Sequence, residues 1–139
     1  MQRADILVEL NKHGILPTAQ RIEIAGILLE KPQHLSAEQV IDRLRLSGSG
    51  VSKATVYNTL NLFRERGLVN ECLVDPERRF YDSTTEPHHH FYNMDTGELT
   101  DIPQRNIQIS GLPDLPDDFH IDGVEVVIKG RSASPKDLA

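Results

Sequence analysis

The sequence predicts an α+β fold, in which a mainly helical domain, residues 1–83, precedes a small strand-rich domain, residues 84–131. Apolar residues recur at helical spacing as far as Gly67, and short β-like runs follow. Gly, Pro and Ser clusters separate the runs. The polar residues 132–139 read as a disordered tail.

The two halves of the chain differ in charge. Residues 1–80 contain 11 Lys and Arg against 10 Asp and Glu, a net charge of +1, whereas residues 81–139 contain 4 against 11, a net charge of −7. The acidic half suits a cation, and the near-neutral half leaves its bases free to cluster on one surface. Because +1 is a weak electrostatic signal for DNA, an argument for DNA binding must rest on the pattern of elements.

Cysteine usage and hydropathy exclude several classes of protein. The single cysteine, Cys72, rules out an intramolecular disulfide framework and a cysteine-rich zinc site, and its apolar neighbours indicate a buried thiol. The chain has no long apolar run and no signal-peptide core at its start. We therefore expect a cytoplasmic protein without a membrane span.

Four helices are predicted. The first covers residues 2–12, the second runs from Thr18 through Glu30, the third follows Ser36, and the fourth runs from residue 53 to about 66. Thr18, Ser36 and Ser52 are typical N-caps, and Gln39 completes a capping box with Ser36.

The fourth helix has two contrasting faces. Its apolar face is formed by Val56, Leu60 and Phe63. The opposite face carries small and polar side chains, namely Ala54, Tyr57, Asn58, Asn61 and Arg64. Such residues can read base edges in the DNA major groove. An ordinary solvated helix face would have the same composition, so this helix alone does not decide the function.

The order of the helices and strands indicates the function. Two β-like runs, Leu68–Val74 and Arg79–Asp82, follow the fourth helix and are joined by a tip that contains Arg78. Three helices, a short turn, a polar-faced helix and a hairpin with basic residues are typical of a winged helix-turn-helix, whose last helix enters the major groove of double-stranded DNA. The predicted DNA-contacting residues are Ser52, Lys53, Thr55, Tyr57, Asn58 and Arg64.

The triplet His88-His89-His90 indicates a metal site. Pro87 directs the chain into an extended conformation, in which His88 and His90 share one face and His89 takes the other. If Asp95-Thr96 forms a two-residue turn, His90 pairs with Asp101 at a Cβ separation of about 4.5–5.5 Å. Two imidazoles with one or two carboxylates suit iron, manganese or zinc. The alternative is a polar, solvent-facing hairpin with incidental histidines.

The rest of the second domain is loop-rich. Residues 103–123 contain three prolines and many acids, with one or two helical turns at 104–109, and residues 124–130 form a last strand. Three strands with little helix cannot easily bury both faces. We therefore expect a homodimer, which also suits two half-sites in a palindromic operator.

Several segments together resemble the ferric uptake regulator family, from Gly14 to Arg131. They are Leu16-Pro17-Thr18-Ala19-Gln20-Arg21, His34-Leu35-Ser36-Ala37-Glu38, Ala54-Thr55-Val56-Tyr57-Asn58-Thr59-Leu60, Arg79-Phe80-Tyr81-Asp82, His88-His89-His90 and Gly97-Glu98-Leu99-Thr100-Asp101. The resemblance implies an N-terminal winged helix and a C-terminal α/β dimerisation domain. It also implies a metal-dependent repressor whose regulatory metal site consists of His34, Asp82, His88, His90 and Asp101.

Aspartate at position 101 resembles the peroxide-sensing branch of the family, in which Fe²⁺ reacts with hydrogen peroxide, a histidine ligand is modified and DNA is released. The implied cofactor is Fe²⁺ or Mn²⁺, and Zn²⁺ can bind the isolated protein without the redox response. The triplet followed by Phe91-Tyr92 also resembles iron-response regulators that sense haem, but no Cys-Pro motif is present, so haem is the second choice. The two Cys-x-x-Cys pairs of a structural zinc site are absent as well.

A different class of function uses the same ligands. His88, His90 and Asp101 could form the two-His, one-carboxylate triad of a non-haem iron enzyme. Such an enzyme of the cupin type needs a barrel cavity, for which the chain has too few strands. A DNA-binding module without metal would leave the His and Asp cluster unexplained. The prediction is therefore a regulator and not an enzyme.

Overall fold

The computed structural model describes residues 1–75 and 77–133, which form two compact units. The first unit comprises residues 1–85, and the second begins at Glu86. Among the described residues, no helix combines the length and the apolar character needed to cross a bilayer.

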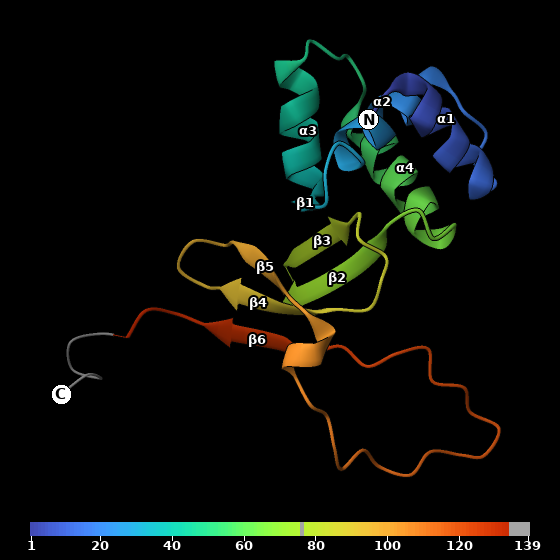
Figure 1. The fold of residues 1–139 in the computed structure, drawn as a ribbon. Helices are drawn as coiled ribbons and strands as arrows, with labels where there is room; N and C mark the ends of the chain where they lie inside the picture. Colours follow the sequence, from blue (N-terminus) through green and yellow to red (C-terminus); the bar gives the residue numbers. More distant parts are fainter. Residues whose placement is uncertain (76, 134–139) are drawn as a thin grey trace. The chain divides into compact units, whose positions relative to one another are not determined.

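The first unit contains the four predicted helices (Figure 1). They are α1 (Arg3–Lys12), α2 (Ala19–Leu28), α3 (Ala37–Leu46) and α4 (Lys53–Glu65). The second helix ends at Leu28 rather than at Glu30, and the side-chain amide of Gln33 donates to Ile27 O at 2.7 Å and to Leu28 O at 3.2 Å. Pro32, four residues after Leu28, has no N–H to donate to Leu28 O, so a longer helix would leave this carbonyl group without its helical donor, and the Gln33 side chain supplies one.

Side-chain caps fix where the helices begin. Thr18 Oγ1 accepts from the Arg21 N–H, Ser52 Oγ accepts from the Thr55 N–H, and Ser36 forms the predicted capping box with Gln39. Each such cap stabilises its helix by about 1 kcal/mol. Gly67, with φ +77°, ends α4 in the left-handed conformation that favours glycine.

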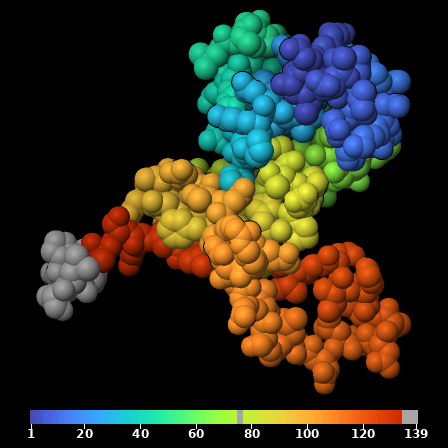
Figure 2. All heavy atoms as spheres, in the orientation of Figure 1, coloured from blue at the N-terminus to red at the C-terminus, as the bar shows by residue number. Residues whose placement is uncertain are grey.

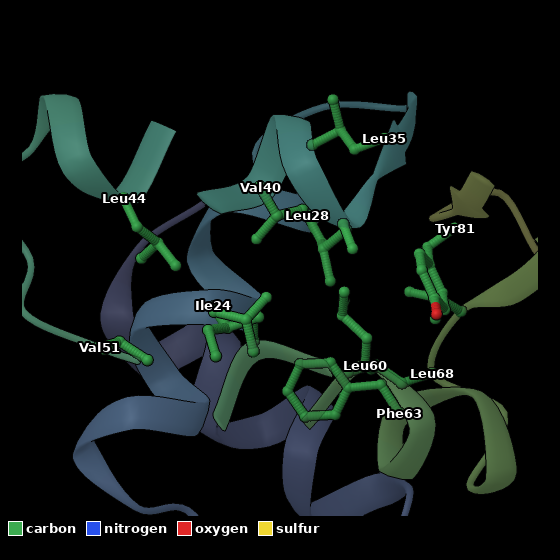
Figure 3. Close-up of a cluster of buried hydrophobic side chains, with 14 of the residues drawn as sticks. Ile24, Leu28, Leu35, Val40, Leu44, Val51, Leu60, Phe63, Leu68 and Tyr81 are labelled. Atoms are coloured by element: carbon green, nitrogen blue, oxygen red, sulfur yellow. The ribbon is translucent and has the colours of Figure 1, made fainter. Parts of the chain in front are cut away.

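The apolar faces of the helices meet in one core (Figure 3). Val56, Leu60 and Phe63 of α4 are fully buried in it, as their spacing predicted. Tyr81 of the following hairpin also belongs to this core. The core therefore fixes α4 against the other helices and leaves its polar face outside.

Three short strands complete the first unit. They are β1 (His34–Ser36), β2 (Asn70–Asp75) and β3 (Arg78–Asp82), in the order β1-β3-β2 with antiparallel pairing. β2 and β3 are the predicted hairpin. β1 is a strand that the sequence did not predict, because three residues are too few to show a period of two. Its pairing with β3 places His34 directly opposite Asp82.

The second unit is a three-stranded sheet of β4 (His89–Asn93), β5 (Leu99–Ile102) and β6 (Val127–Gly130), with one 3₁₀ turn, η1 (Gln104–Asn106), after β5. Its order is β5-β4-β6, and β6 runs parallel to β4. β6 is shorter than the predicted strand, which began at Val124. The predicted tail, residues 132–139, lies mostly outside the described residues.

The pairing of β4 with β5 has the predicted register but not the predicted turn. His90 lies opposite Asp101, as expected. The two-residue turn is wrong: Asn93 O accepts from Gly97 N–H at 2.8 Å, and the Asn93 side chain accepts from Asp95 N–H at 2.9 Å. The wider loop keeps the same centre as the predicted turn, so the strand register is unchanged.

A long connection separates β5 from β6. Apart from η1, the residues between them carry no helix or strand, and most are exposed. In Figure 2 this orange-to-red segment extends away from the strands of its own unit. It returns at Val126, whose carbonyl accepts from the His90 N–H at 3.0 Å. The crossover that parallel pairing requires is here a loop.

Candidate nucleic-acid interface and metal centre

The exposed face of α4 contains most of the predicted DNA-contacting residues. The side chains of Lys53, Tyr57, Asn58 and Arg64 are exposed. Thr55 is half-buried, and its Oγ1 accepts a hydrogen bond from Ser52 Oγ at 2.9 Å. The Ser52 hydroxyl is thus engaged in the helix cap. Its role at this face includes starting α4 in the correct place.

Two glutamates that sequence reasoning did not select contact this face. The Tyr57 hydroxyl donates a hydrogen bond to Glu38 Oε1 at the start of α3. Glu71 of β2 accepts from two arginines: its Oε2 lies 3.0 Å from Arg64 Nε, and its Oε1 lies 2.7 Å from Arg79 Nε. These pairs join residues on different helices and strands, so the spacing within one element does not predict them. The only signal for Glu71 is that it alternates with the buried Cys72 and therefore faces the side of the hairpin that carries Arg79.

The Glu71 bridge changes the interpretation of Arg64. Sequence reasoning placed Arg64 among the residues that contact DNA, and the structure shows that its Nε is bound to a carboxylate. The guanidinium retains other N–H groups that can reach a phosphate. Glu71 therefore links the last turns of α4 to the hairpin through Arg64 and Arg79.

Replacing Glu71 with Gln is expected to loosen this link. One negative charge is lost, so binding to any duplex should become tighter, and the plot of log affinity against log salt should steepen by about one. Discrimination between selected and scrambled duplexes should fall, because Arg64 and Arg79 are no longer held. Fluorescence anisotropy with both duplexes over a range of salt concentrations measures these effects.

The matched control is Glu65→Gln, which removes the same charge from α4. Glu65 lies at 4.0 Å from Arg64 Nη2 and is well exposed, so it provides no comparable link. If the two variants discriminate equally between selected and scrambled duplexes, the role assigned to Glu71 is contradicted.

The first unit brings together two of the predicted metal ligands. His34 and Asp82 are register partners on β1 and β3, and His34 Nε2 lies 3.7 Å from Asp82 Oδ2. Asp82 Oδ1 accepts from the Thr84 N–H at 2.8 Å. The carboxylate is thereby oriented with its second oxygen toward the imidazole.

The second unit brings together the other three. His88 Nε2 lies 3.2 Å and His90 Nε2 lies 3.5 Å from Asp101 Oδ1. The two rings meet edge to face with their centroids 4.5 Å apart. One ligand atom from each of the three residues lies within 4.8 Å of the others. This geometry confirms that His88 and His90 share a face with Asp101.

Hydrogen bonds on the far side of each ring favour metal binding. His88 Nδ1 lies 2.6 Å from Glu86 O, and His90 Nδ1 lies 2.7 Å from Glu125 Oε1. A carbonyl or carboxylate oxygen can only accept, so each Nδ1 carries the proton. In the neutral ring, Nε2 then presents its lone pair toward Asp101. Imidazoles that ligate metals are commonly oriented by such partners. The donor set and its orientation therefore fit a divalent ion.

His89 is not part of this cluster. Its Nδ1 accepts a hydrogen bond from the Val126 N–H at 2.9 Å, so the ring braces the chain before β6. His120 also lies outside the cluster, on the surface, where its Nε2 is 3.6 Å from Asp122 Oδ1. Cys72 is a buried thiol, as its neighbours predicted.

The helices and hairpin of the first unit form a winged helix-turn-helix, and the small sheet that follows completes an α+β fold, as the sequence predicted. The class is that of DNA-binding proteins whose recognition helix follows a short turn. The chain belongs to the ferric uptake regulator family, whose model matches residues 12–113. Members of this family are metal-dependent transcription regulators that bind DNA and form dimers.

The curated relatives include peroxide-responsive repressors. The chain is similar to the peroxide-responsive repressor PerR of Staphylococcus saprophyticus, with 27% identity over 131 residues that cover 93% of this chain and 88% of the relative. PerR of Staphylococcus aureus is 29% identical over 126 residues, covering 89% and 84%.

Solved structures give the same family. The ferric uptake regulator of Pseudomonas aeruginosa with manganese matches with a TM-score of 0.70 and 26% identity, covering 92% of this chain and 98% of that one. The ferric uptake regulator of Vibrio cholerae matches with a TM-score of 0.68 and 24% identity, covering 88% and 96%. At that identity the second match supports the fold alone.

Proposed function

We propose that this chain is a peroxide-responsive repressor that requires Fe²⁺ or Mn²⁺ to bind a palindromic operator. The observation that carries the proposal is Asp101, whose carboxylate lies beside Nε2 of both His88 and His90. The similarity to PerR proteins supports the same branch.

We propose further that one ion takes ligands from both units, namely His34, Asp82, His88, His90 and Asp101. Each unit orients its own ligands: β1 and β3 position His34 and Asp82, β4 and β5 position His90 and Asp101, and His88 directly precedes β4. When Fe²⁺ is bound, it supplies a redox reaction with peroxide, whereas Zn²⁺ has no redox chemistry. Glu125 and the Glu86 carbonyl keep the protons of His90 and His88 on Nδ1, away from the ion.

The coupling between metal and DNA follows from linkage. If the ion binds only one relative orientation of the units, it raises the population of that orientation. A dimer in that orientation presents two α4 helices at the spacing of two half-sites. The factor by which metal tightens DNA binding then equals the factor by which DNA tightens metal binding. Modification of one ligand histidine by peroxide would therefore release both the ion and the DNA.

An anaerobic anisotropy measurement tests the proposed function. The protein is titrated onto a duplex selected from a random library, with Mn²⁺, Fe²⁺ or haem, and stoichiometric peroxide is then added. We expect binding with both metals and loss of binding only in the Fe²⁺ form, with a gain of one oxygen atom on a ligand histidine by mass spectrometry.

The control is Asp101→Glu, which keeps a carboxylate ligand. It should retain metal-dependent DNA binding and respond more weakly to peroxide. Release of DNA by haem, with an Fe²⁺ form that survives peroxide, would overturn the peroxide assignment. An unchanged peroxide response in the variant would overturn the role of Asp101.

A further inference from the structure

The polar face of α4 borders a groove that is lined by the start of α3 and by the β2–β3 hairpin. Tyr57 and Asn61 line it from α4, Arg78 and Arg79 line it from the hairpin, and Glu38 lines it from α3. A carboxylate here is unexpected on a DNA-binding surface, because positive charge strengthens binding to phosphates and negative charge weakens it. Glu38 therefore requires an explanation.

The stability of the fold does not explain why Glu38 lies here. Glu38 and Tyr57 are both exposed, and their hydrogen bond lies at the surface. Exposed polar pairs add little to the free energy of unfolding, because water competes for both partners. The folding of the first unit rests on its buried core and on the helix caps instead.

The direction of the hydrogen bond is fixed. The bond from Tyr57 is the main cause that lowers the pKa of Glu38, and the same bond is the main cause that raises the pKa of Tyr57. Near neutral pH, Glu38 is therefore ionised and can only accept, while the phenol keeps its proton and donates it. The Tyr57 hydroxyl has one proton, and it is used in the hydrogen bond to Glu38.

We propose that Glu38 determines how Tyr57 reads DNA, by leaving the phenol oxygen able to act only as a hydrogen-bond acceptor toward a base. This inference rests on the proposed function, in which α4 enters the major groove. There, adenine N6 and cytosine N4 are donors, whereas guanine N7 and O6 and thymine O4 are acceptors. Tyr57 should therefore select adenine or cytosine over guanine or thymine at one position of one strand. Glu38 is a positioning residue for this contact.

The test is a selection from a random duplex library with the full chain, loaded with Mn²⁺. The chain as it stands should select a site in which one position of one strand prefers adenine or cytosine over guanine or thymine, by up to about tenfold. Glu38→Ala frees the phenol to donate as well as accept, so the preference at that base pair should flatten while the other positions keep theirs. Tyr57→Phe should flatten the same base pair, and the double variant should match Tyr57→Phe alone.

Two further variants separate positioning from charge and from folding. Glu38→Asp keeps the negative charge and the acidic first turn of α3, but it is one methylene shorter and should behave like Glu38→Ala. Glu65→Ala removes a similar charge from α4 and should leave every preference unchanged. Thermal unfolding followed by circular dichroism confirms that each variant is folded.

The outcomes are distinct. A uniform change in affinity for all duplexes in Glu38→Ala, in either direction and with unchanged base preferences, would overturn the inference, because Glu38 would then act through structure or charge alone. If the unaltered chain selects no common site, the proposed function fails and the inference fails with it. A selected site whose preferences survive Glu38→Asp overturns the inference and leaves the proposed function standing.

Discussion

Replacing His90 with Ala should abolish metal-dependent DNA binding, with a fall in Mn²⁺ affinity on the order of a hundredfold or more. Loss of a partner outside the ligand shell already costs about 10–100-fold in metal affinity, and loss of a ligand costs at least as much. His90 is held by three separate contacts, to Asp101, Glu125 and the Val126 carbonyl, which together fix its ring beside Asp101. Calorimetric titration with Mn²⁺ and anisotropy with an operator duplex measure the two effects.

The adjacent histidine is the matched control. His89→Ala removes the acceptor for the Val126 N–H, and it should lower the free energy of unfolding by about 1–3 kcal/mol while Mn²⁺ still binds. His120→Ala, on the exposed loop, should change neither quantity. Mn²⁺ affinity that falls equally in His89→Ala and His90→Ala would show that the ligand set has been assigned incorrectly.

Replacing His34 with Ala should separate metal binding from DNA binding. Asp82, His88, His90 and Asp101 remain as proposed ligands, so Mn²⁺ should still bind, with affinity weakened by roughly 10–100-fold. Saturating Mn²⁺ should tighten DNA binding much less than in the unaltered chain, because Asp82 is then the one proposed ligand from the first unit and the ion constrains that unit less. Anisotropy titrations with and without saturating Mn²⁺ give the coupling directly.

The control for this variant is His13→Ala in the same unit. His13 Nδ1 lies 2.9 Å from Glu9 O near the end of α1, and it belongs to no metal-ligand group among the described residues. Its loss should leave the coupling intact. A His34→Ala protein that retains full stimulation of DNA binding by Mn²⁺ would contradict a shared ion.

The pairing of His90 with Asp101 could be predicted from the sequence because a hairpin relates its strands by simple counting. The predicted pairing was correct although the predicted turn was wrong, because a loop that widens equally on both sides leaves the paired residues unchanged. His34 could not be predicted in this way. Its strand is three residues long and pairs with residues almost 50 positions away, so only the family resemblance assigned it a role.

Glu38 and Glu71 were missed for a related reason. Each is an ordinary acidic residue in its local sequence, and its importance depends on the residue that the fold places opposite it. The apolar pattern of α4 predicted which face is buried. It carried no information about which side chains would contact the exposed face.

The parallel pairing of β6 with β4 also determines when the metal ligands become ordered as the chain folds. All five proposed ligands have been synthesised by residue 101, yet His90 takes its backbone and side-chain partners from residues 125 and 126. Closing this loop carries an entropy cost that local hairpin formation avoids, and contacts of this kind form slowly. We therefore expect the orientation of His90 to be among the last features that a newly made chain acquires, after the first unit has already folded.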